Sequence, residues 1–291
     1  MARKRIGVLL AQADETTQNH FMQGFLQEAF ASDYDVLIFS MYVKYQQTNL
    51  RELGESNIYE LINYDMLDAI VILLDTLQTT GLSDSIQKKI HDKFDGPVLV
   101  IDQKSPYFPS VMNDHCTPIR RLIDHLIEVH HYKDIVFLNG REAHIHSIER
   151  LRGYKESMKA HGLEINEDLT AYGYYVADSA KYHVPTFLGA GATAIICGND
   201  LIASGVITEC KLRGFRVPED ISVVGFDDIP ISSMLEPPLT TIRQERSELG
   251  KCAYVILNSL VHHIPICRTQ LRAALIERES TARYQAPVKK A

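Results

Sequence analysis

Polar residues recur directly after short apolar runs of the chain. Asp75, Asp102 and Asn139 each follow such a run, as do the pairs Asn199–Asp200 and Asp227–Asp228. In open parallel α/β sheets, ligands bind outside the carboxyl ends of the strands, beside helix N-termini with unpaired N–H groups. Because carboxylates and amides exchange hydrogen bonds with hydroxyl groups, this pattern favours a sugar, polyol or nucleoside over an apolar ligand. The alternative for each residue is a structural role as a helix N-cap or turn residue, because Asp and Asn are preferred at these positions.

A second group of candidates lies in the segment AHIHSIERLRGY, which contains His144, His146 and Arg150. Arg150 is the leading ligand residue, because its guanidinium can clamp hydroxyls or a carboxylate with a rigid fork. The alternative for Arg150 is a surface salt bridge with Glu149 or Glu156. No metal site is predicted, since the His pair lacks a third ligand at a recognisable spacing. The doublets His130–His131 and His262–His263 end helices, where partial positive charge suits the helix dipole, and receive no function.

Tyrosines are candidates for stacking against a ligand, because the chain has no Trp. Tyr174 and Tyr175 in AYGYYVADS could lie against the apolar face of a sugar, although plain packing explains a Tyr at a strand end equally well. Signatures of catalysis are missing. GAGATA precedes an apolar run instead of opening a helix, and no Walker A, GxSxG or HExxH sequence occurs. We therefore predict neither catalytic residues nor a cofactor, and favour binding without chemistry.

Apolar runs alternate with amphipathic segments along most of the chain, which is typical of βαβ units with buried parallel sheets. The expected strands are 5–11, 35–39, 69–74, 98–101, 135–138, 169–174, 193–197, 221–226 and a late run at 271–277. The expected helices are 19–30, 118–129, 148–161, 201–213 and 247–261, each with apolar residues three or four positions apart. Two breaks are expected, at 139–147 and at 229–241, where Pro230, Pro237 and Pro238 exclude a continuous helix.

Length and charge narrow the class of protein. The 291 residues suffice for about two domains, and 37 acidic against 30 basic residues give a net charge of -7, which disfavours direct binding to DNA. The longest apolar run, Ala69 to Leu74, is far shorter than the roughly 20 residues of a membrane helix. Five scattered cysteines without a CxxC pair, and no signal-peptide pattern, favour core thiols and a cytoplasmic protein without membrane contact.

The stretch AIICGNDLIASGVITECKLRGFRVPEDISVVGFDDIPISSMLEPPLTTIRQ, residues 194–244, closely resembles the effector-binding core of lactose-repressor-like (LacI/GalR) transcription regulators. IERLRGY at 148–154, IGVLL at 6–10 and ALIERESTA at 274–282 fall in the family's order, so the resemblance covers nearly the whole chain. It implies an α/β fold of two Rossmann-like lobes with parallel sheets, joined by three crossings, as in type I periplasmic binding proteins. The expected N-terminal lobe is 1–139 plus 242–262, and the C-terminal lobe is 140–241 plus 263–282, followed by a tail at 283–291.

The same resemblance implies residue roles. The expected effector ligands are Arg150, Asn199, Asp227 and, from the other lobe, Asp102, with His144, His146 and Tyr175 as wall residues and Phe21 as an aromatic of the first helix. Asp200 is expected to cap its helix instead. The crossings are expected near Asn139, near Thr240 and at 261–266. The sequence of residues 11–19 departs from the family pattern.

The implied function is a cytoplasmic sensing domain that binds a small effector, such as a sugar or polyol, and controls DNA binding allosterically. Apolar residues in 19–30 and 57–66 suggest a homodimer. The family's helix-turn-helix normally precedes the first strand, whereas here that strand begins at Arg5, so operator DNA would be bound only through a domain that this chain lacks. Two alternatives stay open: a sensor module of another signalling protein with a C-terminal output domain, and a solute-binding protein.

Overall fold

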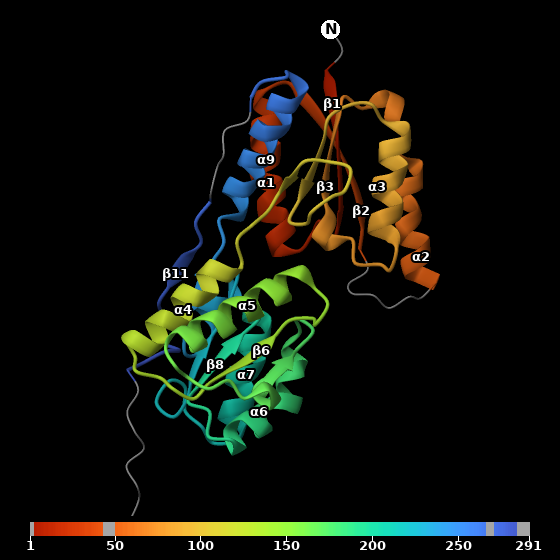
Figure 1. Ribbon diagram of the computed structural model, residues 1–291. Helices are drawn as coiled ribbons and strands as arrows, with labels where there is room; N and C mark the ends of the chain where they lie inside the picture. The colour runs from red at the N-terminus through yellow and green to blue at the C-terminus, as the bar shows by residue number, and fades with distance from the viewer. Residues whose placement is uncertain (1–2, 43–49, 266–270, 284–291) are drawn as a thin grey trace, which may run out of the picture. The chain divides into compact units, whose positions relative to one another are not determined.

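The chain folds into two α/β units, each built around its own parallel sheet. The computed structural model describes residues 3–42, 50–265 and 271–283 (Figure 1). Unit 1 comprises Met1–Asn113 with Glu245–Leu271, and unit 2 comprises Asp114–Gln244 with Arg272–Ala291. Each unit is therefore discontinuous in sequence, and the chain passes between the units three times. The predicted fold class, two α/β lobes with parallel sheets joined by three crossings, is confirmed.

The sheet of unit 1 has five parallel strands in the order β2-β1-β3-β4-β5. They are β1 (Lys4–Ala11), β2 (Tyr34–Met41), β3 (Ala69–Leu73), β4 (Val98–Ile101) and β5 (Ser110–Val111). Residues of β3 and β4 are buried on both faces, because helical segments cover both sides of the sheet. In register, Val8 of β1 lies between Ile38 of β2 and Val71 of β3.

Two helices cover one face of this sheet, α1 (Thr16–Ala31) and α9 (Arg246–Val261), although they lie far apart in the sequence (Figure 1). Phe25 of α1 meets Tyr254 of α9 edge to face at 5.9 Å. Two glycines allow the close approach, since a Cβ on Gly24 would lie 1.9 Å from the Ser247 carbonyl oxygen and one on Gly250 would lie 2.0 Å from that of Phe21. The helix α9 thus completes the core of unit 1 from a distant part of the chain.

The other face of the sheet is covered by α3 (Leu82–Lys93) and the 3₁₀ turn η1 (Asn57–Leu61). The remaining short elements of unit 1 are α2 (Leu50–Ser56), η2 (Tyr64–Met66) and η3 (Leu74–Thr76). Tyr59 of η1 is buried and donates its hydroxyl to the carbonyl of Leu10.

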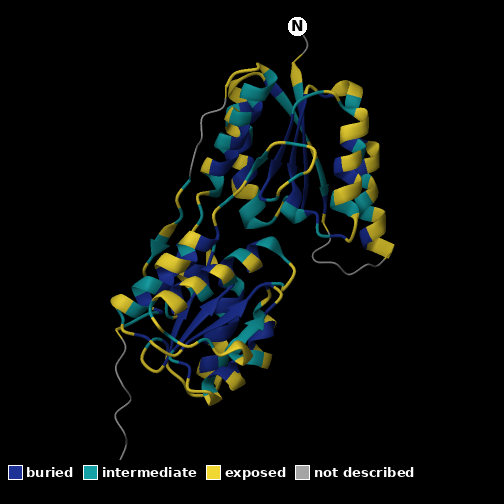
Figure 2. Cartoon of the chain, viewed as in Figure 1, coloured by how far each residue is buried: buried dark blue, intermediate teal, exposed yellow. Residues whose placement is uncertain are grey.

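Unit 2 has four parallel strands in the order β7-β6-β8-β9: β7 (Thr170–Tyr172), β6 (Ile135–Asn139), β8 (Ala194–Cys197) and β9 (Ser222–Val224). One face packs against α6 (Ala180–Gly189) and α7 (Asp200–Leu212), and the other against α4 (Cys116–Glu128) and α5 (Ile145–Ala160). Figure 2 shows the buried strands between partly exposed helices. Successive side chains of β6 point to opposite faces of the sheet. Val136 and Leu138 face one pair of helices, and Ile135 and Phe137 face the other.

The remaining elements of unit 2 are short. They are the turns η4 (Glu167–Leu169) and η5 (Ala177–Ser179), the single-turn helix α8 (Ile231–Met234), and an antiparallel pair of β10 (Thr241–Arg243) and β11 (Ala274–Ile276). Asp228 ties this pair to β9, because its carboxylate accepts from Arg243 at 2.6 Å and from Arg278 at 2.7 Å.

The division into units differs from the expected lobes. Residues 114–139, expected in the first lobe, belong to unit 2, since β6 pairs with β7 and β8 and α4 packs on α5. The polar stretch 139–147 is an ordinary β6–α5 connection within one unit, so no crossing occurs near Asn139. The crossings lie at 113/114, 244/245 and 271/272. The one expected at 261–266 falls partly outside the described residues, as does the tail after Arg283.

The predicted core thiols agree with the structure at the cysteines that it describes. Cys116, Cys197 and Cys210 are buried and Cys252 is partly buried, all as free thiols, whereas Cys267 lies outside the described residues. Among the helices in residues 3–42, 50–265 and 271–283, none has the length and apolar character needed to cross a membrane.

Candidate functional site

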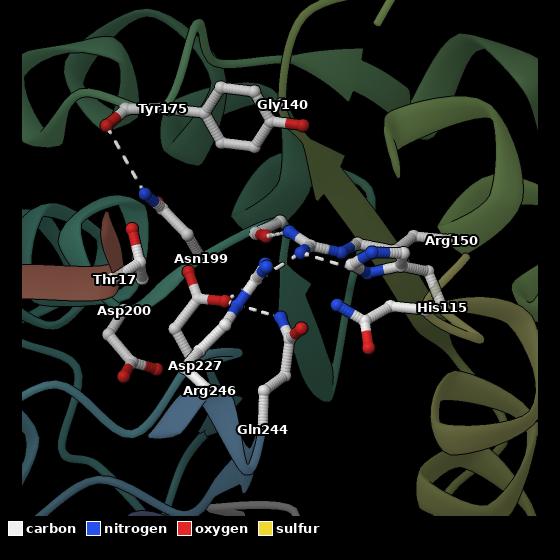
Figure 3. A network of polar contacts seen from close by, with 12 residues as sticks. Thr17, His115, Gly140, Arg150, Tyr175, Asn199, Asp200, Asp227, Gln244 and Arg246 are labelled. Carbon is white, nitrogen blue, oxygen red and sulfur yellow. Dashed lines mark hydrogen bonds and ion pairs between the residues drawn. The ribbon is translucent and has the colours of Figure 1, made fainter. Parts of the chain in front are cut away.

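The carboxyl end of the unit 2 sheet holds a buried arginine at the centre of a polar network (Figure 3). Arg150 of α5 is 3% exposed, donates to the carbonyl oxygen of Gly198, and has Nη2 3.3 Å from His115 Nδ1. Its guanidinium carbon lies 3.8 Å from the centroid of the Phe226 ring, a cation–π arrangement. The alternative of a salt bridge to Glu149 or Glu156 is wrong, because those carboxylates pair with Arg152 and Arg120. Arg150 is therefore held in one orientation by several contacts.

Asp227 faces this arginine from the loop after β9. Its Oδ1 lies 3.7 Å from Arg150 Nη2 and accepts a hydrogen bond from Gln244 Nε2 at 2.8 Å. The backbone of Asp227 has φ 110°, a conformation that residues other than glycine rarely adopt. The carboxylate is 15% exposed, so it keeps a solvent-facing side that a ligand hydroxyl can reach.

Asn199 caps helix α7 and Asp200 does not. Asn199 Oδ1 accepts from the N–H of Ile202 at 2.9 Å, and its Nδ2 donates to the carbonyl of Tyr175 at 3.3 Å (Figure 3). Asp200, expected as the cap, is instead fully buried. Asn199 is thus both the N-cap of α7 and a contact to the loop that carries Tyr175.

The Asp200 carboxylate joins three segments of unit 2. It accepts from the Ser232 hydroxyl at 2.6 Å, the Thr241 hydroxyl at 2.5 Å and the N–H of Ile229 at 2.9 Å. Burial, followed by the negative charge of Asp227, raises the pKa of Asp200 to about 7, against the lowering effect of these hydrogen bonds. Asp200 therefore holds the segment before β10 against the start of α7.

Histidine and tyrosine rings line the side of the network formed by α5 and the loop after β7. The Tyr175 hydroxyl lies 2.7 Å from Ser147 Oγ and 3.2 Å from His144 Nδ1. His146 stacks on His115 with ring centroids 3.9 Å apart and is 6% exposed. These rings combine apolar faces with hydrogen-bonding edges, which suits a ligand of the same mixed character.

Left-handed backbone conformations gather at the strand ends of both units. Among the described residues, nine other than glycine have positive φ, and six of them come just after strands: Gln12, Asp102, Tyr174, Tyr175, Asp227 and Asp228. The other three, Asp33, His131 and His263, follow helix ends, where this conformation is ordinary. Such strain costs about 1 to 3 kcal/mol per residue and clusters at functional sites. The conformations therefore mark the same strand ends that the residue types select.

In unit 1, Asp102 is the corresponding buried carboxylate after β4. It is 1% exposed and accepts from Arg246 Nη1 at 2.6 Å and from the N–H and Nδ2 of Asn113 at 3.0 and 3.1 Å. Desolvation and the charge of Asp102 raise the pKa of the neighbouring Asp75 to about 7, although Arg246 acts in the opposite direction. These groups form a compact charged cluster at the carboxyl end of the unit 1 sheet.

The structure thus groups most of the predicted site residues within their units. Six of them, Arg150, Asn199, Asp227, His144, His146 and Tyr175, lie at the carboxyl end of the unit 2 sheet, and Asp102 lies at that end of unit 1. Phe21 is different, because it is 1% exposed and stacks on Phe25 within the core between α1 and α9.

Sequence reasoning missed His115, Gln244 and Arg246. Each follows a strand of two or three residues, β5 or β10, by a few positions. Strands of that length contain almost no apolar run. The other residues were selected because they follow an apolar run, so this criterion could not select these three. The polar sequence MNDHC after the Pro-bounded PYFPSV segment was the available signal for His115.

Comparison with known proteins gives consistent matches. Residues 123–281 match the model of the periplasmic binding protein-like domain. The chain is 26% identical to the HTH-type transcriptional repressor PurR of Vibrio campbellii over 261 residues, covering 87% of this chain and 73% of that protein. It is 33% identical to the HTH-type transcriptional regulator AscG of Escherichia coli over 186 residues, 62% of this chain and 54% of the relative. A solved sugar-binding transcriptional regulator of the LacI family from Escherichia coli, complexed with phosphate, superposes with a TM-score of 0.76 at 25% identity, covering 96% of this chain and 99% of that one.

Proposed function

The chain belongs to the family of periplasmic binding protein-like domains, and from this premise we propose that it is the effector-sensing domain of a LacI-type transcriptional regulator. The effector-binding domain in such regulators has this fold, and the relatives named above are transcriptional regulators. The resemblance first seen in residues 194–244 is confirmed by these matches.

The observation that carries the proposal is the pair of buried Arg150 and partly buried Asp227 at the strand ends of unit 2. A guanidinium and a carboxylate that are already fixed by His115, Gly198 and Gln244 lose little freedom when they bind a ligand. The carboxylate accepts from ligand hydroxyls, and the guanidinium donates to ligand oxygens. We propose Arg150, Asp227, Asn199, His144, His146 and Tyr175 of unit 2 as effector contacts, with Asp102 of unit 1.

The ligand class follows from the donors and acceptors present. A sugar or polyol offers hydroxyl groups to Asp227 and Arg150, and an apolar ring face to His146 or Tyr175. The sugar-binding regulator described above supports this class. The hydroxyls of this network are engaged within it, since Ser232 and Thr241 donate to Asp200 and Ser147 pairs with Tyr175. We propose that the ligand is bound and released unchanged.

We further propose that the regulator acts in the cytoplasm as a homodimer and contacts operator DNA through a separate DNA-binding domain. The net charge of -7 supports this proposal, because a negatively charged chain repels DNA. This chain would then bind the effector, and another domain would bind DNA. Effector binding would then change operator affinity by a coupling free energy of about 1 to 3 kcal/mol.

A thermal-shift screen tests the proposal. The purified chain is heated alone and with mono- and disaccharides, sugar phosphates, polyols and nucleobases, each in large excess. A compound that binds only the folded state raises the Tm. At 100 times its Kd it increases the free energy of unfolding by about 2.7 kcal/mol. A sugar or polyol that raises the Tm of the wild type but not of Arg150→Ala supports both the function and the site. A folded chain that no compound stabilises contradicts the proposed sensing of this ligand class.

A further inference from the structure

Three side chains outside the proposed effector site bring ligand atoms together elsewhere on unit 2. His125 lies on the last turns of α4, His130 follows that helix, and Glu277 comes directly after β11. Because His130 precedes β6, this group lies towards the amino end of the sheet, away from the strand ends that hold Arg150. One nitrogen of each histidine and one carboxylate oxygen of Glu277 all lie within 4.8 Å of one another.

The distances fit a tetrahedral metal ion. His125 Nε2 and His130 Nε2 are 3.1 Å apart, and His125 Nε2 is 3.5 Å from Glu277 Oε1. Zinc bonds to His nitrogen and carboxylate oxygen measure about 2.0 to 2.2 Å, so two ligands of a tetrahedral zinc lie about 3.3 to 3.6 Å apart. The spacing His-x₄-His also falls within the His-x₃₋₅-His range of zinc sites.

The three ligands stand on well-held backbone. The segment after α4 is anchored by the hydroxyl of Tyr132, which lies 2.6 Å from Ser222 Oγ and donates to the carbonyl of Ala282 at 2.8 Å. Glu277 is placed by the pairing of Ile276 with Thr241 of β10. Its side chain is 59% exposed, whereas that of His125 is 20% exposed, so the outer side of the group is open to water and to an entering ion.

We propose that His125, His130 and Glu277 bind a divalent transition-metal ion of the zinc type, with water completing the coordination. Imidazole nitrogen and one carboxylate suit Zn²⁺ and its first-row neighbours, and not Mg²⁺ or Ca²⁺, which prefer oxygen ligands throughout. Bound metal would join the end of α4 to the segment after β11, two parts of unit 2 that are remote in sequence, and would stabilise the folded state by mass action. The competing explanation is a metal-free cluster in which one imidazole donates to the other and Glu277 pairs with His125.

The test uses the full chain stripped of metal with EDTA, dialysed, and titrated with Zn²⁺ by isothermal calorimetry, with Co²⁺ absorption as a report of coordination geometry. The wild type is expected to bind one Zn²⁺ per chain, and Glu277→Gln and His130→Asn are each expected to weaken binding by more than about tenfold. His262→Asn is the matched control, since His262 is an exposed histidine of the doublet that ends α9. Mg²⁺ should not compete.

Two results overturn the proposal: no stoichiometric Zn²⁺ binding by the folded wild type, which leaves the hydrogen-bonded cluster only, or Zn²⁺ binding that both variants retain. Glu277→Gln keeps the size of a mostly exposed side chain, so its folding is not in question even if His130→Asn unfolds. A Zn²⁺-dependent rise in Tm that Glu277→Gln removes and His262→Asn preserves gives independent support. These outcomes do not depend on whether the chain senses a sugar.

Discussion

At the scale of single residues, the contacts of Arg150 explain why one side chain can serve both the fold and the proposed ligand. Its fork reaches Gly198, His115 and Asp227 and its flat face lies on Phe226. The residue type and its spacing selected Arg150 as a ligand residue, with a surface salt bridge as the alternative. Burial at 3% exposure adds a structural role that the spacing of residues does not reveal.

Arg150→Ala should therefore weaken both ligand binding and folding. The loss of a charged donor to the ligand is expected to cost about 1.5 to 3 kcal/mol, roughly tenfold to a hundredfold in Kd. Leaving Asp227 and the Gly198 carbonyl without this partner should lower the free energy of unfolding by about 1 to 3 kcal/mol. Calorimetry with the first ligand found in the screen, and urea denaturation, measure the two effects. Arg152→Ala, on the same helix but exposed and paired with Glu149, is the control; equal effects in both variants would contradict the assignment.

Asp200 should make the stability of unit 2 depend on pH. Its folded pKa is raised from an ordinary 3.8 to about 7, so between these values the folded state binds more protons than the unfolded state. The free energy of unfolding should therefore fall as pH rises through this window, by at most about 1.4 kcal/mol per pH unit for this group, and level off above it.

Urea denaturation at pH 5, 6, 7 and 8 checks this dependence. Asp200→Asn should show a smaller fall than the wild type, because an amide accepts from Ile229 and Ser232 without titrating. Asp178→Asn, at an exposed carboxylate, should follow the wild type. Parallel curves for the wild type and Asp200→Asn would show that Asp200 ionises normally.

At the scale of elements, the sequence predicted most strands, including the three-residue strands β7, β9 and β11, and five helices, but not α3. The expected strand 98–101 coincides with β4, and the expected helix 201–213 differs from α7 by one residue at each end. β5 and β10, with two and three residues, were missed, and the Pro185-containing helix α6 was not anticipated. Their apolar patterns are too short or too interrupted to predict an element. Packing against the rest of the unit decides their conformation instead.

Helix α7 also offers a test of how element packing positions the site. A Cβ on Gly205 would lie 2.1 Å from the carbonyl oxygen of Ala177, a backbone atom, so α7 must shift away from the turn η5. Gly205→Ala should lower the free energy of unfolding by about 1 to 3 kcal/mol and weaken ligand binding by displacing Asn199. Gly189→Ala in α6, where no atom lies within 4 Å of the added Cβ, should be neutral or stabilising. Urea denaturation measures both; equal stability of the two variants would contradict the packing argument.

At the scale of the whole molecule, the proposed dimer should be visible in solution. Unit 1 exposes large apolar side chains in and near the segments expected to pair, among them Phe30, Leu53, Leu61 and Met66. Light scattering at micromolar concentration should give twice the chain mass of 32.9 kDa. Leu61→Glu, at a side chain 73% exposed, should shift the mass towards the monomer, whereas Leu212→Glu in unit 2, 74% exposed, should not. A monomeric wild type would refute the dimer.

The discontinuity of both units has a consequence for how the protein is made. Unit 1 lacks α9, and with it Leu249, Tyr254 and Leu257 of its core, until residues 245–261 have been synthesised. Unit 2 lacks β11, which pairs with β10, until residue 276. A ribosome translating from the N-terminus therefore exposes the unfinished core of unit 1 until α9 emerges, and it completes the β10–β11 pairing of unit 2 only after that. Nascent chains of this protein should depend on chaperones that shield apolar surface during synthesis, far more than a chain whose first domain completes itself before the second begins.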